Sequence, residues 1–273
     1  MKLILIGFLH RCAQRPYCLR YLLQDDSVPP FILPSLVVAI PGFLILAVLR
    51  RLVDGVLPSY GSLALVFLGI VAQTGSLFLG MFIGGHFQSP IGLWVGKLAS
   101  VGGTLLFIWL CKSQASWRDI GLRSSQPKTI GLTAGLFFVM AGVTWFLAHC
   151  YAPRQAFSAG AFAFMLLLSG TDEELLFRGA MPALLRRADE TGRRQRAVNT
   201  GLVFTIPTIA FMLMHGLRFV DQHFAFSWQA LALAGFGGCI LMCIRLSTRS
   251  VWPSLIVHNM VNAGLVVAMA LWR

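Results

Sequence analysis

The amino-acid sequence predicts an all-α fold, a polytopic membrane helix bundle of about eight transmembrane helices. Hydrophobic residues make up 57% of the 273 residues, charged residues make up 12%, and the mean hydropathy is +0.75. Soluble domains carry about 25% charged residues, so roughly half of the usual charge is missing. Apolar runs of about 20 residues, long enough to cross a hydrocarbon core, recur along the whole chain. We therefore expect an integral multi-pass membrane protein, in the cytoplasmic membrane if the source is bacterial.

Eight apolar runs, separated by polar or basic residues, define the expected helices. They cover residues 31–49, 62–84, 91–111, 130–150, 157–185, 199–217, 228–247 and 252–271. The fifth run predicts one long helix. The chain then divides into an N-terminal segment (1–30) that is interfacial or poorly ordered, N-terminal membrane helices (31–115) and a C-terminal membrane core (116–273).

The chain has a formal net charge of +12, and its basic residues gather at the ends of the apolar runs. Such residues are a topology signal and contact anionic lipid headgroups. Most lie on one predicted face, which includes Arg245 and Arg249 in an expected loop, and this face is predicted to be cytoplasmic. The sequence has no basic face with interleaved aromatic residues, so membrane lipids rather than nucleic acid are the expected partners.

Lys97 interrupts a span near its start, where a lysine can extend its ammonium group to the interface.

Three polar clusters interrupt the apolar runs of the C-terminal half. They are Glu173-Glu174-x-x-x-Arg178, Phe211-x-x-x-His215 and His258-x-x-x-Asn262. Ionisable groups at membrane depth are expensive and rare, so each cluster is a functional hypothesis. Two carboxylates, two imidazoles and an amide can hold and activate a water molecule. The combination predicts a hydrolase inside the bilayer.

The two adjacent glutamates are expected to have different roles. Glu174 and Arg178 are four residues apart with the acid on the N-terminal side, the favourable order for a same-face ion pair. Glu173 lies about 100° round the helix from Glu174 and faces a different neighbour. We therefore assign the Glu174–Arg178 pair a supporting role and Glu173 the chemistry. Taken alone, this cluster is equally consistent with a purely structural role, in which both glutamates only join helices.

The two histidines are expected at different depths. His258 and Asn262 share one helical face, which suggests a common polar target or a pair of interhelical hydrogen bonds. His215 falls late in its span and His258 falls early, on helices expected to run in the same direction. At 1.5 Å per residue the two rings would then differ in depth by roughly 15 Å. Convergence on one site requires a shifted helix boundary, a broken helix or a strong tilt.

Two versions of the chemistry are open. In one, Glu173, His215 and His258 hold a divalent metal such as zinc and leave a fourth position for water. In the other, which needs no cofactor, Glu173 and His215 deprotonate water. His258 and Asn262 then donate to the developing oxyanion. Both versions suit hydrolysis of an amide. A secondary transporter, or a catalytically silent membrane scaffold or immunity protein, would also bury such groups.

The order EExxxR, FxxxH and HxxxN resembles the CAAX prenyl protease 2 family. This family is also called the CPBP or Abi intramembrane proteases, and it includes proteins similar to lysostaphin resistance protein A. The matching stretches are residues 172–179, 211–215 and 250–262, and residues 116–123 resemble a short element ahead of the family's core. The resemblance covers residues 116–270, which makes 116–273 the expected intramembrane protease core.

This resemblance implies a membrane endopeptidase, whose eukaryotic members remove the last three residues after a prenylated cysteine. The family roles would fall to Glu173 as the group that activates water, Glu174 and Arg178 beside it, His215 as its assistant, and His258 and Asn262 as metal ligands or oxyanion donors. The family's mechanism has been described both as metal-dependent and as glutamate-dependent, so both versions stay open. The implied substrate is a peptide or a lipidated protein, with CAAX-type C-terminal processing as one form.

Overall fold

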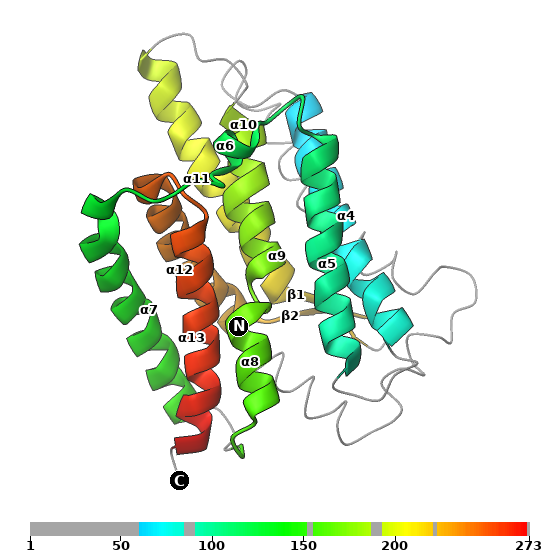
Figure 1. Cartoon of the computed structure of the whole chain (residues 1–273), viewed down its shortest axis with the longest axis vertical. Coiled ribbons are helices and arrows are strands. Elements are labelled where there is room, and N and C mark those ends of the chain that lie inside the picture. Colours follow the sequence, from blue (N-terminus) through cyan, green and yellow to red (C-terminus); the bar gives the residue numbers. More distant parts are fainter. Residues whose placement is uncertain (1–59, 85–90, 152–154, 187–192, 221–222, 272–273) are drawn as a thin grey trace.

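The computed structural model describes residues 60–84, 91–151, 155–186, 193–220 and 223–271. Within these ranges the chain is a bundle of helices with one short β-hairpin, so the predicted helical fold class is confirmed (Figure 1). The N-terminal segment (1–30) and the first expected helix (31–49) lie outside the described residues.

The first half of the described chain contains two long helices, two short turns and a third long helix. They are α4 (Tyr60–Gly84), α5 (Ile91–Leu110), α6 (Trp117–Ile120), the 3-10 turn η1 (Pro127–Thr129) and α7 (Ile130–Tyr151). Next comes a segmented column that consists of α8 (Ala159–Leu167), α9 (Thr171–Glu173), the π-helix η2 (Glu174–Ala180) and α10 (Met181–Arg186). The chain ends with α11 (Arg193–Gly216), β1 (Leu217–Val220), β2 (His223–Phe226), α12 (Trp228–Thr248) and α13 (Trp252–Leu271).

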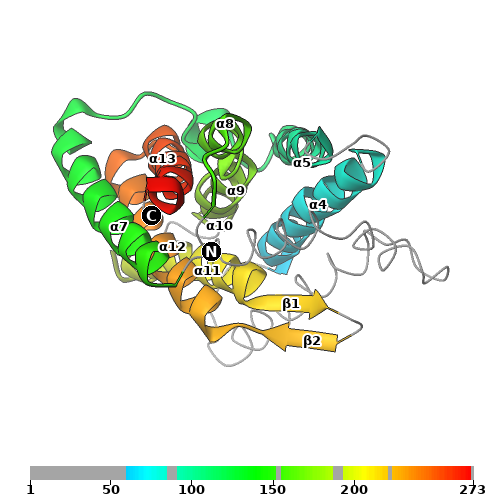
Figure 2. The same cartoon turned by 90° about the horizontal axis from the view of Figure 1, so that it is seen from below.

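The segmented column from α8 to α10 occupies the middle of the bundle. Figure 2 shows it between α13 on one side and the pair of α4 and α5 on the other. Helix α13 packs against α7 and α8, and α11 packs against α12. The column therefore touches both the C-terminal helices and the N-terminal pair, and polar side chains from both sides can meet along it.

Five helices of the described chain are long and apolar enough to cross a membrane. They are Gly61–Gly84, Gly92–Leu110, Pro127–Cys150, Trp228–Thr248 and Trp252–Leu271. The protein is thus an integral multi-pass membrane protein, but the expected number of about eight spans is not confirmed. The expected spans 157–185 and 199–217 are not among the five. The first is broken, and in the second the apolar stretch Thr200–Gly216 is shorter than the five spanning helices.

The prediction of one long helix over 157–185 is wrong, because the chain leaves the helix between α8 and α9. At this break the backbone N–H of Gly170 donates to Asn259 Oδ1 of α13 at 2.8 Å. A Cβ at position 170 would lie 2.6 Å from His258 Nδ1, so a glycine is needed for this approach. Shortly after the break the column winds as the π-helix η2, a rare form that is frequent at functional sites.

A large apolar core fixes the orientation of the column. Leu176, Phe177 and Met181 are fully buried against side chains of α4, α5 and α11. The rings of Phe177 and Phe211 meet edge to face with centroids 5.4 Å apart, a favourable aromatic geometry. This packing determines the rotation of the column about its axis, and with it the directions in which its polar side chains point.

Arg245 does not lie in a basic loop, as the sequence led us to expect, but inside α12 with 1% of its surface exposed. Its guanidinium donates to three backbone oxygens, those of Arg178 at 2.7 Å, Asp119 at 3.0 Å and Ile120 at 3.0 Å. Five rigid donors allow one arginine to satisfy several carbonyl groups at once. Arg245 therefore joins α12, α6 and the π-helix η2.

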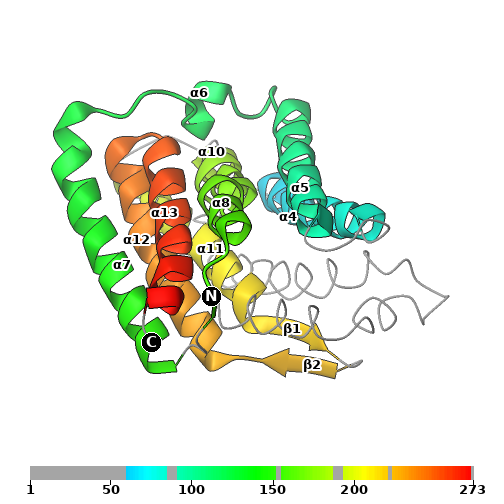
Figure 3. The same ribbon diagram turned by 60° about the horizontal axis from the view of Figure 1, so that its bottom comes forward.

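The β-hairpin was not expected from the apolar pattern. Its strands pair antiparallel, with Leu217 opposite Phe226 and Val220 opposite His223. Figure 3 shows that the hairpin continues directly from the end of α11 and extends toward the side of the bundle where α4 and α5 lie. Helix α11 therefore ends at Gly216, inside the expected span 199–217.

Helices α4 and α5 approach each other through small residues. A Cβ at Gly80 would lie 2.5 Å from the Cβ of Ala99 and 2.8 Å from the Cα of Gly96. The two backbones are therefore nearly in contact at this point, as is common between membrane helices. The close contact aligns α5 as the helix that faces the column.

We predict that Gly80→Ala lowers the stability of the protein. The added methyl group has no room, so α4 and α5 must separate, at a cost of about 1–3 kcal/mol for such overpacking. Thermal unfolding in detergent measures the effect. The matched control is Gly102→Ala in α5, where a Cβ meets nothing within 4 Å. Equal unfolding temperatures for the two variants would show that the close contact is not required.

Candidate active site

Glu174 is the buried member of the glutamate pair. Its Oε1 lies 2.8 Å from His258 Nδ1 and 3.1 Å from Nη1 of Arg178, and the side chain has no exposed surface. The guanidinium of Arg178 also lies over the ring of Phe211, with 4.1 Å between its Cζ and the ring centroid. Such a stacked cation is well suited to a buried ion pair. The expected ion pair between Glu174 and Arg178 is therefore present, and the supporting role of Glu174 stays a prediction.

Glu173 points away from this pair and toward three other helices. Its Oε1 accepts a hydrogen bond from Lys97 Nζ of α5 at 3.2 Å. Its Oε2 lies 3.8 Å from Nε2 of His215 in α11 and 3.9 Å from Nε2 of His258 in α13. The side chain of Glu173 is 15% exposed and that of His215 is 17% exposed, whereas His258 is completely buried. The side chain of Glu173 is therefore partly exposed, unlike that of Glu174, although its Oε2 atom is itself buried.

The hydrogen bonds of the two histidines determine where their ring protons lie. His215 Nδ1 lies 2.7 Å from the backbone oxygen of Phe211, which can only accept, so Nδ1 carries the hydrogen. His258 Nδ1 likewise faces the carboxylate of Glu174. In their neutral forms both rings therefore present a bare Nε2 to Glu173 Oε2.

Three hydrogen-bond acceptors thus converge without a donor between them. Glu173 Oε2 and His258 Nε2 are both buried and have no hydrogen-bond partner among the described residues. Orphaned buried acceptors are costly, so a native structure normally supplies a donor. A water molecule has two hydrogens to donate and suits this position.

The expected difference in depth between the two histidines is wrong, because both rings meet one carboxylate oxygen. The physical reason is the boundary of α11. This helix begins at Arg193, ends at Gly216 and then turns into the β-hairpin, so its last turn does not lie at the far surface (Figure 1). His215 in that last turn reaches the level of His258, which lies in the second turn of α13.

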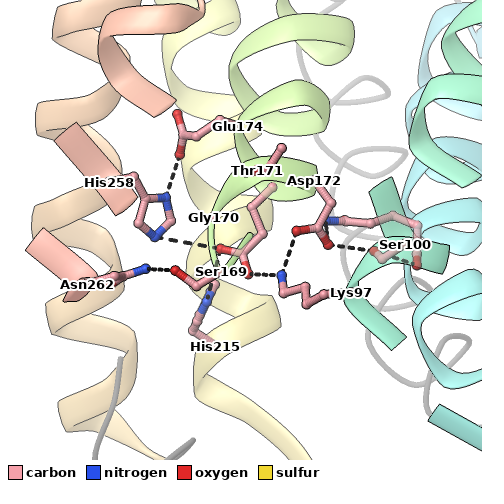
Figure 4. A network of polar contacts seen from close by, with 12 residues as sticks. Lys97, Ser100, Ser169, Gly170, Thr171, Asp172, Glu174, His215, His258 and Asn262 are labelled. Carbon is pink, nitrogen blue, oxygen red and sulfur yellow. Dashed lines mark hydrogen bonds and ion pairs between the residues drawn. The ribbon is translucent and has the colours of Figure 1, made fainter. Parts of the chain in front are cut away.

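Asn262 and His258 do not share a target, although they lie on one face of α13. The Nδ2 of Asn262 donates to Ser169 Oγ at 2.8 Å, and that hydroxyl donates to the backbone oxygen of Met165 at 2.8 Å. Figure 4 shows this contact next to the histidine and the column. Ser169 therefore holds the amide within the site, at the break in the helix.

Lys97 and Asp172 belong to the site but were not predicted from the sequence. Lys97 does not extend to the interface, because its Nζ lies 2.6 Å from Asp172 Oδ1 as well as 3.2 Å from Glu173 Oε1 (Figure 4). Asp172 also accepts from Ser100 Oγ at 2.5 Å and from Gln73 Nε2 at 3.1 Å. The sequence did contain a signal for this contact, namely complementary charges. A lone cation in one apolar run complements a third acid directly before the glutamate pair.

Asn259 is a further residue that the motifs did not include. It follows His258 directly, and besides accepting from the Gly170 N–H it donates from Nδ2 to Thr171 Oγ1 at 3.2 Å. These two contacts attach α13 to the break in the column. Because His258 is the preceding residue of α13, the same contacts hold its ring beside the glutamates.

The predicted metal ligands Glu173, His215 and His258 face one another, and their donor types suit zinc. Each imidazole donates from Nδ1 to an oxygen, as metal-binding histidines usually do. As placed, however, no three His, Cys, Asp or Glu side chains of the described ranges form a group that could hold a metal ion. The metal version therefore remains a proposal.

Comparison with known families supports the resemblance seen in the motifs. Residues 155–264 match the family model described as type II CAAX prenyl endopeptidase Rce1-like. The match includes the Glu-Glu pair and both histidines, and it confirms the expected relationship to the CPBP and Abi proteins. No curated protein and no solved structure matches the chain.

We predict that Glu174→Ala destabilises the protein more than Glu173→Gln does. Removing Glu174 leaves Arg178 buried without its ion-pair partner, which typically costs about 3–5 kcal/mol. Glu173→Gln keeps the shape of a partly exposed side chain and an oxygen for Lys97. Thermal unfolding of both variants in the same detergent measures the difference. If Glu174→Ala unfolds at the wild-type temperature, the supporting role of Glu174 is wrong.

Proposed function

Because residues 155–264 match the Rce1-like family model, we propose that this chain is an intramembrane endopeptidase in which Glu173 and His215 activate a water molecule. The observation that carries this proposal is the convergence of Glu173 Oε2 with the Nε2 atoms of His215 and His258. The match to this family supports protease activity in general. The roles of the individual residues are our inference from the geometry.

The reaction can be written with the groups at hand. Water donates its two hydrogens to Glu173 Oε2 and His215 Nε2, and Glu173 takes one proton as the water oxygen attacks the carbonyl carbon of the peptide. The resulting tetrahedral intermediate carries the charge on the former carbonyl oxygen. Its C–N bond breaks as the proton passes from Glu173 to the leaving nitrogen. A positioned base of this kind contributes about 10²–10⁴-fold to the rate.

His258 and Asn262 are the candidate donors to the oxyanion. Asn262 already presents its Nδ2 within the site, where Ser169 holds it. His258 can donate from Nε2 only as an imidazolium, because its Nδ1 hydrogen points to Glu174. In that form both ring nitrogens would donate, one to the glutamate and one to the oxyanion. Donors placed in advance are an effective way to stabilise this intermediate.

A divalent metal such as zinc, if bound by Glu173, His215 and His258, would supply a Lewis acid and lower the pKa of its water. The position of Lys97 argues for the metal-free version, because its ammonium group already contacts Glu173 at 3.2 Å and would repel a second cation. We therefore propose the glutamate-dependent mechanism. In this mechanism Glu173, His215, His258 and Asn262 act on a substrate whose scissile bond lies within the membrane bundle.

The proposed substrate class is a membrane-tethered peptide or lipidated protein, with removal of C-terminal residues after a prenylated cysteine as the specific form. This is the reaction for which the matched family is named. A silent scaffold would use its buried polar groups to bond one another. Here Glu173 Oε2 and His258 Nε2 lack partners among the described residues, which favours a site that binds something.

We predict that Glu173→Gln abolishes cleavage while the protein stays folded. Purified wild type and variant, reconstituted in liposomes, are incubated with prenylated and unlipidated peptides, and mass spectrometry locates the cuts. Loss of the general base should slow cleavage by about 10²–10⁴-fold. Cuts only in prenylated peptides would support CAAX-type processing. Equal rates for the two proteins, or no cleavage by either, would refute the proposed function.

We also predict that cleavage survives removal of divalent metals. The wild-type enzyme is dialysed against a membrane-permeant chelator, and its metal content and its activity are then measured together. Activity should persist with less than one metal ion per chain, because Glu173, His215 and a water molecule suffice. Loss of activity that zinc restores would instead establish the metal version with the same three residues.

A further inference from the structure

We propose that the edge of strand β1 that faces away from β2 (the β1 edge) binds the substrate as an added β-strand and presents its scissile bond, in an extended segment, to Glu173 and His215. This inference rests on the proposed function, because it concerns how the substrate of that site is held. Strand β1 (Leu217–Val220) begins two residues after His215. Two Cα atoms at that separation along the chain lie no more than about 8 Å apart. The strand therefore starts beside the proposed active site.

A peptide substrate inside the bilayer needs hydrogen-bond partners for its backbone. Lipid offers none, so a segment that leaves its helix exposes polar groups at a high cost. A segment that stays helical keeps its carbonyl groups bonded within the helix. Cleavage thus calls for an extended segment with replacement partners. Addition of a strand to a sheet edge supplies such partners and is a recurrent mode of peptide recognition.

The base of the hairpin is fixed to the two helices that it joins. The backbone N–H of Ser227 donates to the oxygen of Gly216 at 2.8 Å, and Ser227 Oγ accepts from the N–H of Ala230 in the first turn of α12. A Cβ at Gly216 would lie 2.8 Å from the Cβ of Leu231, so the end of α11 lies directly against α12. These contacts hold the start of β1 beside His215.

The register of the hairpin shows which backbone groups point away from β2. In an antiparallel pair of strands, opposite residues alternate between pairs that exchange both hydrogen bonds and pairs that exchange none. The bonded residues at the base of the hairpin form a pair of the first kind. Counted from there, Leu217 with Phe226 and Phe219 with Phe224 are pairs of the second kind. Leu217 and Phe219 therefore direct their N–H and C=O groups to the β1 edge.

The β1 edge faces the helical bundle. Figures 2 and 3 show β1 on the side of the helices and β2 on the outside. Among the described residues the sheet consists of these two strands, so no described strand pairs with the outward groups of Leu217 and Phe219. An extended peptide that pairs with them would lie on the bundle side of the hairpin, with one end at His215.

Two other readings of the hairpin are tested against this one. In the first, the β1 edge pairs with a part of this chain that lies outside the described ranges. In the second, the hairpin is an apolar wall that contacts only side chains of the substrate. Strand addition requires the N–H of every second substrate residue, because alternate residues of a strand direct their polar groups to opposite edges. Neither of the other readings requires this alternation.

The first test is a backbone scan of the substrate. The prenylated peptide of the cleavage assay and its unlipidated form are synthesised with one N-methyl group at each residue in turn, the scissile nitrogen excepted. The values of KM and kcat are measured in liposomes. We expect KM to rise by roughly two- to tenfold at two residues that are two positions apart, because each loses one hydrogen bond. The residue between them should tolerate the methyl group. Effects without this alternation would overturn the inference.

The second test removes one outward N–H from either edge of the hairpin. Phe219→Pro removes it from the β1 edge. Phe224→Pro is the matched control, because this residue belongs to the same pair and directs its N–H to the opposite edge. Proline is tolerated in an edge strand where the N–H is not bonded within the sheet. Phe219→Ala and Phe224→Ala remove the side chains and keep the N–H groups. Thermal unfolding in detergent shows whether all four variants are folded.

We expect KM to be roughly two- to tenfold higher for Phe219→Pro than for Phe219→Ala, because only the proline removes a hydrogen bond to the substrate. No such difference is expected between Phe224→Pro and Phe224→Ala. Equal effects of the two prolines, or an effect of Phe224→Pro alone, would overturn the assignment to the β1 edge.

Binding separates the inference from the proposed function. The affinity of each N-methylated peptide for the Glu173→Gln variant is measured by fluorescence anisotropy, which needs no cleavage. If the wild type cleaves nothing but the affinities alternate along the peptide, the proposed function fails and the inference stands. If the peptides are cleaved without alternation in KM or affinity, the proposed function stands and the inference fails. Peptides that are neither bound nor cleaved would overturn both.

Discussion

Asp172, Glu173 and Glu174 are three consecutive carboxylates inside an apolar helical bundle, and the rest of the site depends on how their charge is compensated. A buried charge without a partner costs several kcal/mol. Successive side chains on a helix point about 100° apart, so one cation cannot serve all three. Arg178 compensates from within the column and Lys97 from α5. This division of charge joins the column to the N-terminal pair of helices.

The close approach of partners to these buried carboxylates also explains the irregular backbone of the column. His258 can approach Glu174 only where Gly170 leaves room for its ring, and there the helix is interrupted. An interrupted helix within a membrane protein frees backbone groups that lipid cannot satisfy. Asn259 accepts the free N–H of Gly170, from the residue next to the histidine. The break at Gly170 therefore makes room for the ring of His258, and Asn259 satisfies the backbone group that the break leaves free.

The sequence predicted what depends on short separations along the chain. The limits of α4, α5, α7, α12 and α13 follow from apolar runs, and the Glu174–Arg178 pair follows from helical periodicity. The partners of Lys97 lie 75 residues away, and no local pattern encodes such a contact. The depth of His215 depended on where α11 begins, because the helix starts at Arg193, before the expected span, in residues that carry no apolar signal.

The charge arrangement also determines which of the three acids can serve as a base. A base needs an oxygen that is free of donors, on a side chain that is not completely sealed from solvent. Both oxygens of Asp172 accept hydrogen bonds, and its side chain is 1% exposed. Glu174 is fully buried, with His258 and Arg178 at one oxygen. Glu173 is 15% exposed and directs Oε2 toward two imidazole rings. Among the described acids of the column, Glu173 alone combines an oxygen without a hydrogen-bond donor and a side chain that is partly exposed.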